Sequence, residues 1–187
     1  MSSAFSHKLL HVVVTAFACT LVLAPAASAQ SSSTSGGATF VPPPPPPEKA
    51  AIVDGKAIAP ATAPERVKRV IAAGNRLIGK PYRYGGGHRP FSRQLDTGYD
   101  CSGTASYALF GGRFVRLPMP SGSFTRWGER GPGRWITVYA HSGHMYIVVA
   151  GLRLDTGMRD DPSRTGPGWS KKLRPVDAFA ARHPSGY

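Results

Sequence analysis

Cysteine and histidine are the residue types in this sequence best suited to covalent chemistry. Cys101 follows Asp100 and opens a run of mostly small residues that predicts a closely packed helix over residues 101–109. At the start of a helix, free N–H groups and the helix dipole stabilise a thiolate, the nucleophilic form of cysteine. The position of Cys101 therefore predicts a nucleophile for attack on an amide carbon.

A thiol nucleophile needs a base within reach, and His144 is the first candidate. It starts an apolar run over residues 144–154, directly after a turn, where a sheet would hold its ring against the start of the helix. Asp155 follows that run, and a bend near Gly151 would bring it back to fix the tautomer of His144. His141 is the alternative base. Asp155 is alternatively a cap for the turn at residues 155–157.

Less reactive roles for the same residues stay open. Cys101 is alternatively an inert buried thiol, and His144 a hydrogen-bonded core histidine. His88, beside three glycines, is interpreted as a loop residue. No metal-ligand spacing connects His88, His141 and His144, so neither a metal nor another cofactor is expected.

The elements that position these residues are expected within residues 64–187. Apolar residues at helical spacing predict a first helix over residues 64–78, capped by Gly79. Residues 134–140 and 144–154 predict an antiparallel hairpin, residues 157–168 are largely loop, and residues 176–182 form a short closing helix or turn. Helices followed by strands predict an α+β fold with helices packed on an antiparallel sheet.

The first third of the chain has the composition of an exported protein. Residues 1–29 resemble a secretory signal, with an apolar run too short for a membrane span and a small-residue cleavage site, Ala27-Ser28-Ala29. Residues 30–63 are rich first in Ser and Gly and then in Pro, which predicts a flexible and then a stiff linker. A retained membrane anchor is the alternative to cleavage. No stable membrane insertion is expected after signal removal.

Charge and cysteine usage limit the partners. The formal net charge is +13, and removal of residues 1–29 takes away one cation, Lys8, to leave +12. Such a field favours anionic partners, for example bacterial wall polymers, or is simply a solvated basic surface. No nucleic acid is expected, since no nucleic-acid-binding motif is present. The exported chain would keep only Cys101, which excludes an internal disulfide.

Three stretches in this order resemble the signatures of the NlpC/P60 family. They are a Pro-Tyr-x-x-Gly-Gly loop from Pro81 to Gly86, the tetrad Asp100-Cys101-Ser102-Gly103, and a His-led strand from His144 to Gly151. The resemblance covers most of residues 64–155. It implies a papain-like α+β fold and a secreted or envelope-associated cysteine peptidase. The implied substrate is the stem peptide of cell-wall peptidoglycan, often cut between D-γ-glutamate and a diamino acid.

The resemblance also implies roles for particular residues. Cys101 is the implied nucleophile and His144 the base, and Asp155 best matches the polar residue that orients the histidine. Tyr82 corresponds to the tyrosine that helps to bind the developing oxyanion. Asp100 and Ser102 correspond to residues that hold the free amino end of the stem peptide.

Some segments depart from the family pattern. Residues 133–139 replace its Gly-Asp-Leu stretch, His144-Met145-Tyr146 replaces His-Val-Gly, and residues 89–99 form a longer insert. A non-catalytic peptidoglycan-binding or scaffold module of the same fold is therefore the second hypothesis, and an acyltransferase is the third. A monomer is expected, because the sequence shows no surplus amphipathic helix.

Overall fold

An antiparallel sheet organises the structure, a computed structural model that describes residues 48–92, 94–157 and 166–187. Within these residues the sheet contains six strands in the order β3-β8-β4-β5-β6-β7, and every neighbouring pair is antiparallel. The strands are β3 (Glu129–Arg130), β4 (Ile136–His141), β5 (His144–Val149), β6 (Leu152–Asp155), β7 (Gly168–Ser170) and β8 (Ala180–His183).

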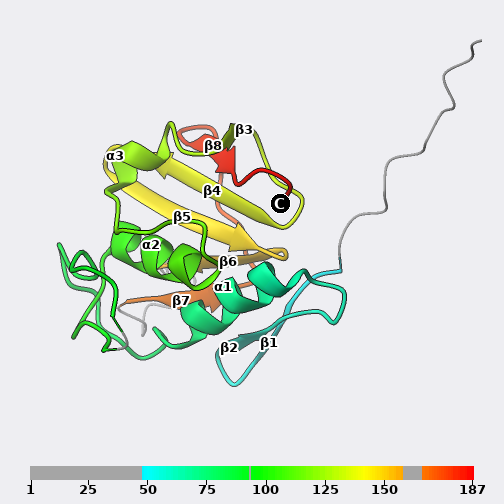
Figure 1. The fold of residues 1–187 in the computed structure, drawn as a ribbon, viewed down its shortest axis with the longest axis horizontal. Coiled ribbons are helices and arrows are strands. Elements are labelled where there is room, and N and C mark those ends of the chain that lie inside the picture. The colour runs from blue at the N-terminus through cyan, green and yellow to red at the C-terminus, as the bar shows by residue number, and fades with distance from the viewer. Residues whose placement is uncertain (1–47, 93, 158–165) are drawn as a thin grey trace, which may run out of the picture. The chain divides into compact units, whose positions relative to one another are not determined.

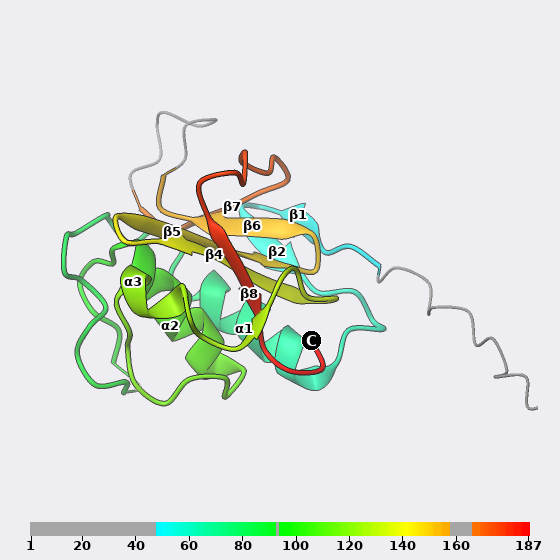
Figure 2. The same cartoon turned by 90° about the horizontal axis from the view of Figure 1, so that it is seen from above.

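Two helices lie side by side against one face of this sheet (Figures 1 and 2). They are α1 (Glu65–Asn75) and α2 (Cys101–Gly111), while the short α3 (Ser121–Phe124) packs on β4. Between these helices and the sheet lies a core of fully buried side chains that includes Val67, Leu109 and Ile147. The α+β prediction, with helices packed on an antiparallel sheet, is confirmed. No helix in the described ranges is long and apolar enough to cross a bilayer.

The end of the expected linker has to be corrected, because residues 51–58 form a hairpin of β1 (Ala51–Val53) and β2 (Lys56–Ile58). Asp54 and Gly55 both have positive φ, 49° and 74°. Asp-Gly is the pair that favours a type I′ turn, and here it lies among alanines and prolines that are typical of a linker. The folded part therefore begins well before Pro64. Residues 1–47, with the expected signal and most of the linker, lie outside the described residues.

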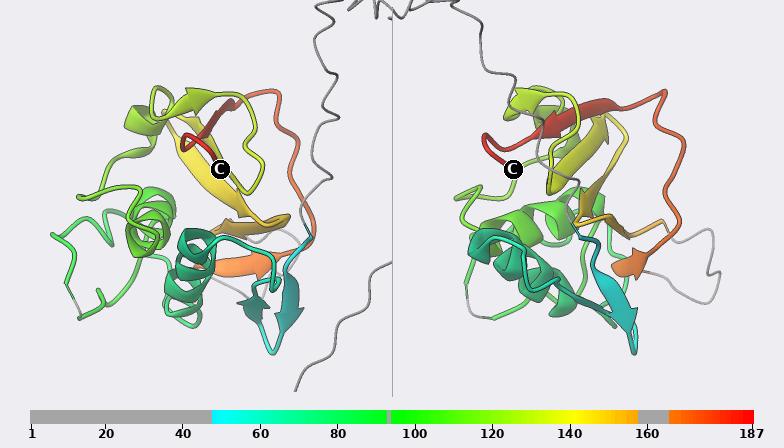
Figure 3. Two further views of the ribbon diagram at one scale, coloured as in Figure 1. Left: turned by 45° about the vertical axis from the view of Figure 1, so that its right-hand side comes forward. Right: turned by 90° about the vertical axis from the view of Figure 1, so that its right-hand side faces the viewer.

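Asn75 connects this hairpin to α1 and to the edge of the main sheet. Its Nδ2 donates to the Ala57 carbonyl, and its Oδ1 accepts from the Ala57 N–H and from Trp169 Nε1, all at 2.8 Å. Figure 3 shows the hairpin beside α1 and β7 in both views. The helix therefore ends at a residue whose side chain holds three separate elements together.

The expected strand over residues 144–154 is in fact two strands. Ala150 and Gly151, with φ of 46° and 79°, form a tight turn, and β6 returns along β5 with Leu154 opposite Ile147. The mostly apolar pattern of this run predicted one strand, and the turn lies where a bend near Gly151 was expected. The turn places Asp155 beside the start of β5.

The C-terminal segments follow the sequence expectations in part. Residues 158–165 of the expected loop lie outside the described residues, but its last residue, Gly168, already belongs to β7. The segment 176–182, expected as a short helix or turn, is a turn that continues into β8. This strand pairs with β3 and β4 and completes the sheet on that side.

The loop at residues 81–86, here called the glycine loop, packs closely on the start of α2. This contact fixes the position of Cys101 relative to the loop. A Cβ added at Gly103 would lie 2.1 Å from the Gly86 carbonyl oxygen. No larger residue fits there without separating the loop from the helix.

We expect Gly103→Ala to lower the free energy of unfolding by about 1–3 kcal/mol, because the clash is with backbone rather than with a flexible side chain. Urea denaturation measures this change. Gly122→Ala in α3 is the matched control, since an added Cβ there meets nothing within 4 Å. Equal stability of the two variants would contradict the packing argument.

Candidate active site

The cysteine at the start of α2 is half-buried and free. Asp100 precedes it as the N-cap, and its Oδ1 accepts a 2.7 Å hydrogen bond from the Gly103 N–H. The first amides of a helix have no partner within the helix. The Cys101 thiol and backbone N–H therefore lie at the positive end of the α2 dipole, which favours an anion there.

The His144 ring lies between Cys101 and Asp155. One side of the ring is hydrogen-bonded to Cys101. On the other, Nε2 is 3.1 Å from Asp155 Oδ1, and the Asp155 side chain is fully buried. Extending the β5–β6 register by one residue places Asp155 opposite Tyr146, which shares a face with His144 because alternate strand residues point the same way. The structure thus brings the three predicted residues together.

His141 has a different environment, although it is paired with His144 across the β4–β5 turn. Its Nδ1 accepts a 3.0 Å hydrogen bond from the Gly143 N–H, and its ring packs 4.7 Å from Phe179. Its ring centroid is 6.4 Å from that of His144. Of the two candidate bases, His144 is the one whose ring contacts Cys101.

Two opposing effects set the protonation of His144. Burial of the ring lowers its pKa, but the hydrogen bonds to Asp155 and Cys101 and the negative charge of both raise it more, from 6.5 to about 9. For Asp155, burial raises the pKa, but hydrogen bonds from His144 and the Gly157 N–H and the charges of His144 and Arg174 lower it more. The carboxylate and a protonated ring therefore stabilise each other.

Arg174, which the sequence analysis did not select, completes the cluster. Its NH1 donates to Asp155 Oδ2 at 2.8 Å and also lies 2.7 Å from His144 Nε2. A guanidinium only donates, so the second contact requires a lone pair on Nε2, whereas the raised pKa of His144 requires a proton there. A hydrogen bond from NH1 to Nε2 and a proton on Nε2 therefore exclude each other. Because Asp155 offers one oxygen to each cation, we favour the raised pKa and infer that the NH1–Nε2 contact lengthens on protonation.

Tyr82 lies close enough to the cysteine for the charge of Cys101 to act on its hydroxyl. The Tyr99 N–H donates to the Pro81 carbonyl and the Arg83 N–H to the Tyr99 carbonyl, both at 3.1 Å, which fixes the backbone around Tyr82. Burial raises the pKa of Tyr82, and the nearby charges of Cys101 and Asp100 raise it further. The hydroxyl therefore stays protonated at neutral pH and is able to donate a hydrogen bond.

The contacts of Asp100 connect the glycine loop to the helix. Oδ1 accepts from the Ser102 hydroxyl and lies close to His88 Nε2, both at 3.1 Å, while Oδ2 accepts from the Gly85 N–H at 3.0 Å. His88 Nε2 is also 3.1 Å from Ser102 Oγ. His88 is therefore more than a loop residue. Its position beside the glycines was the available signal, but nothing in the sequence connected it with Asp100.

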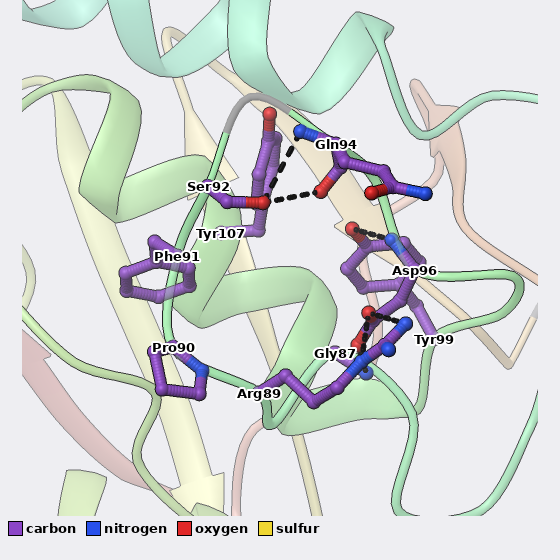
Figure 4. Close-up of a pocket in the computed structure, with 9 residues that line it drawn as sticks. All are labelled: Gly87, Arg89, Pro90, Phe91, Ser92, Gln94, Asp96, Tyr99 and Tyr107. Atoms are coloured by element: carbon purple, nitrogen blue, oxygen red, sulfur yellow. Dashed lines mark hydrogen bonds and ion pairs between the residues drawn. The ribbon is translucent and has the colours of Figure 1, made fainter.

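Phe91 of the insert packs against Tyr107 and Phe110 of α2, with ring centroids 6.1 and 4.3 Å apart, and Figure 4 shows Phe91 beside Tyr107. Asp96 accepts from Arg89 Nε at 2.7 Å and from the Gly87 N–H at 3.0 Å, and a cavity of about 10 Å³ remains beneath the insert. A larger hollow of about 460 Å³ lies between the insert and the loop at residues 83–86, with Arg83 and the exposed Tyr84 on its wall. Residues of the insert therefore form part of the wall of this hollow.

The described residues contain no group of three or more His, Cys, Asp or Glu side chains that could hold a metal ion.

Comparison with known proteins gives a likeness of fold. No protein-family model and no curated protein sequence matches the chain. A hypothetical invasion protein of Mycobacterium tuberculosis is 22% identical over 73% of this chain and 69% of its own, with a TM-score of 0.45. The P60 domain of a Mycobacterium avium paratuberculosis antigen is 22% identical over 64% and 93%, with a TM-score of 0.47.

A third similar structure is RipD from Mycobacterium tuberculosis, at 20% identity over 64% of this chain and 98% of its own, with a TM-score of 0.43. That protein is described as a non-catalytic NlpC/p60 domain protein adapted to peptidoglycan binding.

The raised pKa of His144 predicts how stability depends on pH. A proton held more tightly in the folded state stabilises it fully below pH 6.5, and this contribution is lost as pH rises through about 9. The shift of the His144 pKa from 6.5 to about 9 corresponds to about 3 kcal/mol of folding free energy.

We therefore expect the free energy of unfolding to fall between pH 6.5 and 9, and this slope to be largely absent in His144→Gln. Denaturant titrations at several pH values measure it. His141→Gln removes a neighbouring histidine outside the hydrogen-bonded cluster and should keep the slope. The same slope in the His144→Gln protein would contradict the assignment.

Proposed function

We propose that this protein is an exported cysteine peptidase of the NlpC/P60 type that cleaves amide bonds in peptidoglycan stem peptides. The observation that carries the proposal is the hydrogen-bonded order Cys101–His144–Asp155 at the start of α2. A thiol, an imidazole and a buried carboxylate in this order are the parts of a nucleophilic triad. The three sequence stretches that resemble the family supply the substrate class.

Acylation starts from the thiolate of Cys101 beside protonated His144. The sulfur attacks the amide carbon, and the oxygen that becomes negative meets the Cys101 N–H and the Tyr82 hydroxyl, which has kept its proton. His144 then delivers its proton to the leaving amine as the C–N bond breaks. A thioester on Cys101 and a neutral His144 remain.

Deacylation uses the same residues in the opposite protonation states. Neutral His144 removes a proton from water, the hydroxide attacks the thioester carbon, and the acid leaves as the thiolate returns. Asp155 keeps the ring oriented and stabilises the imidazolium each time it forms. We propose this triad as the site, with Asp100 and Ser102 beside it for the amino end of the stem peptide.

One observation favours the second candidate, a non-catalytic peptidoglycan-binding module. The contact of Arg174 NH1 with His144 Nε2 places a permanent cation where a catalytic imidazolium has to form. A site held in this arrangement would keep the groove but slow proton transfer. The basic charge of the chain would support binding to an anionic wall in either case.

Digestion of purified peptidoglycan distinguishes the two functions. We expect the protein to release stem-peptide fragments identified by mass spectrometry, and Cys101→Ala to release none because the thioester cannot form. Asp155→Asn should slow release by about 10²-fold or more, since the His144 proton is no longer held by a carboxylate.

Co-sedimentation with the same peptidoglycan is the control for binding. If the unmodified protein binds the wall but releases no fragments, the result contradicts the peptidase proposal and supports the binding module. Fragments from Cys101→Ala would show that another group performs the cleavage.

A further inference from the structure

We propose that Arg174 is a positioning residue that competes with His144 for Asp155 and favours the neutral ring with its proton on Nδ1. The inference rests on the proposed function for its catalytic meaning, but its geometry does not. Arg174 lies in the segment between β7 and β8, thirty residues after His144.

The geometry defines two arrangements of the cluster. In the first, Nε2 carries a proton and donates to Asp155 Oδ1, and NH1 contacts only Oδ2. In the second, Nε2 accepts from Arg174 NH1 at 2.7 Å and the ring proton occupies Nδ1, the nitrogen left to face Cys101. Arg174 donates to Asp155 Oδ2 in both arrangements, at 2.8 Å in this structure. The protein therefore converts between them by moving one proton and lengthening one contact.

Burial makes the contact of Arg174 with the site strong. Its side chain is 19% exposed and the Asp155 side chain 0% exposed, so solvent screens the pair weakly. The guanidinium carbon also lies 6.0 Å from the centroid of the Tyr146 ring. These contacts hold the guanidinium beside the imidazole.

The other charged or titratable groups around His144 come from each element packed on it. They are Asp155 and Arg153 on β6, Cys101 on α2, His141 on β4 and Tyr146 on β5. Arg153 Nε is 3.6 Å from Asp155 Oδ2, the oxygen that Arg174 also contacts, and adds a second cation beside it. Arg174 NH1 is in contact with the ring itself.

The consequence concerns how readily His144 releases its proton. Asp155 and Cys101 favour the imidazolium, and a general acid that holds its proton too tightly delivers it poorly. Arg174 opposes them by its charge and by stabilising the lone pair on Nε2. In the arrangement that Arg174 favours, Nδ1 carries the proton and has no lone pair for water. The ring can therefore act as the base in deacylation only after the proton moves to Nε2 and the NH1–Nε2 contact lengthens.

Nuclear magnetic resonance of ¹⁵N-labelled histidine tests this without any substrate. In the unmodified protein above its titration midpoint, we expect neutral His144 to carry its proton on Nδ1. A neutral ring protonated on Nε2 would overturn the proposal, and this measurement needs no variant.

Variants measure the size of the effect. In Arg174→Met, the midpoint of His144 should rise by about one pH unit or more, because a nearby cation is lost and Asp155 is left to the ring. Arg174→Lys keeps a cation and should give a smaller rise. Lys172→Met removes an exposed charge from the same segment and should leave the midpoint unchanged. An unchanged or lower midpoint in well-folded Arg174→Met would also overturn the proposal.

The peptidoglycan assay separates this inference from the proposed function. If wall fragments are released, the alkaline limit of activity in Arg174→Met should move upward with the His144 midpoint. Cys101-dependent cleavage with no change at His144 would leave the peptidase standing and remove the role of Arg174. The expected shift at His144 without any cleavage would support the role of Arg174 and contradict the proposed peptidase.

Discussion

The buried carboxylate of Asp155 is the constraint on which the site depends. Its side chain has no exposed surface, and a charge in that position is stable only when it is paired and hydrogen-bonded. Its partners come from separate parts of the chain: the His144 ring on β5, the Gly157 N–H after β6 and the Arg174 guanidinium after β7. The site is therefore complete only when this half of the sheet is folded.

The sequence was sufficient where a functional residue carries its own local signal. Cys101 follows a capping aspartate at a helix start, and His144 follows a turn at the start of an apolar strand. The α+β arrangement followed from the order of such segments. Asp155 was harder, because Gly151 indicated a bend but no residue pattern indicates that Ala150, a non-glycine residue, also adopts positive φ and makes the turn tight.

Long-range partners were beyond the sequence for a physical reason. Arg174 follows two exposed lysines and looks like part of a solvated basic run, yet it alone of the three reaches Asp155. His88 similarly reaches Asp100 across the glycine loop. In the hairpin before α1, Asp54-Gly55 was a readable turn signal, but the contacts of Asn75 with Ala57 and Trp169 join positions 18 and 94 residues apart.

The N-terminal edge of the described chain has a mechanical consequence. The Ala50 N–H donates to the Ala150 carbonyl at 2.8 Å, and the Lys49 side chain lies against Gly151. These are the two residues of the turn that returns β6 to β5. Tension applied through the preceding residues, as when a tethered protein is pulled away from a surface, would be delivered first to this turn. The spacing between the histidine and its carboxylate would therefore respond to load before the core of the sheet does.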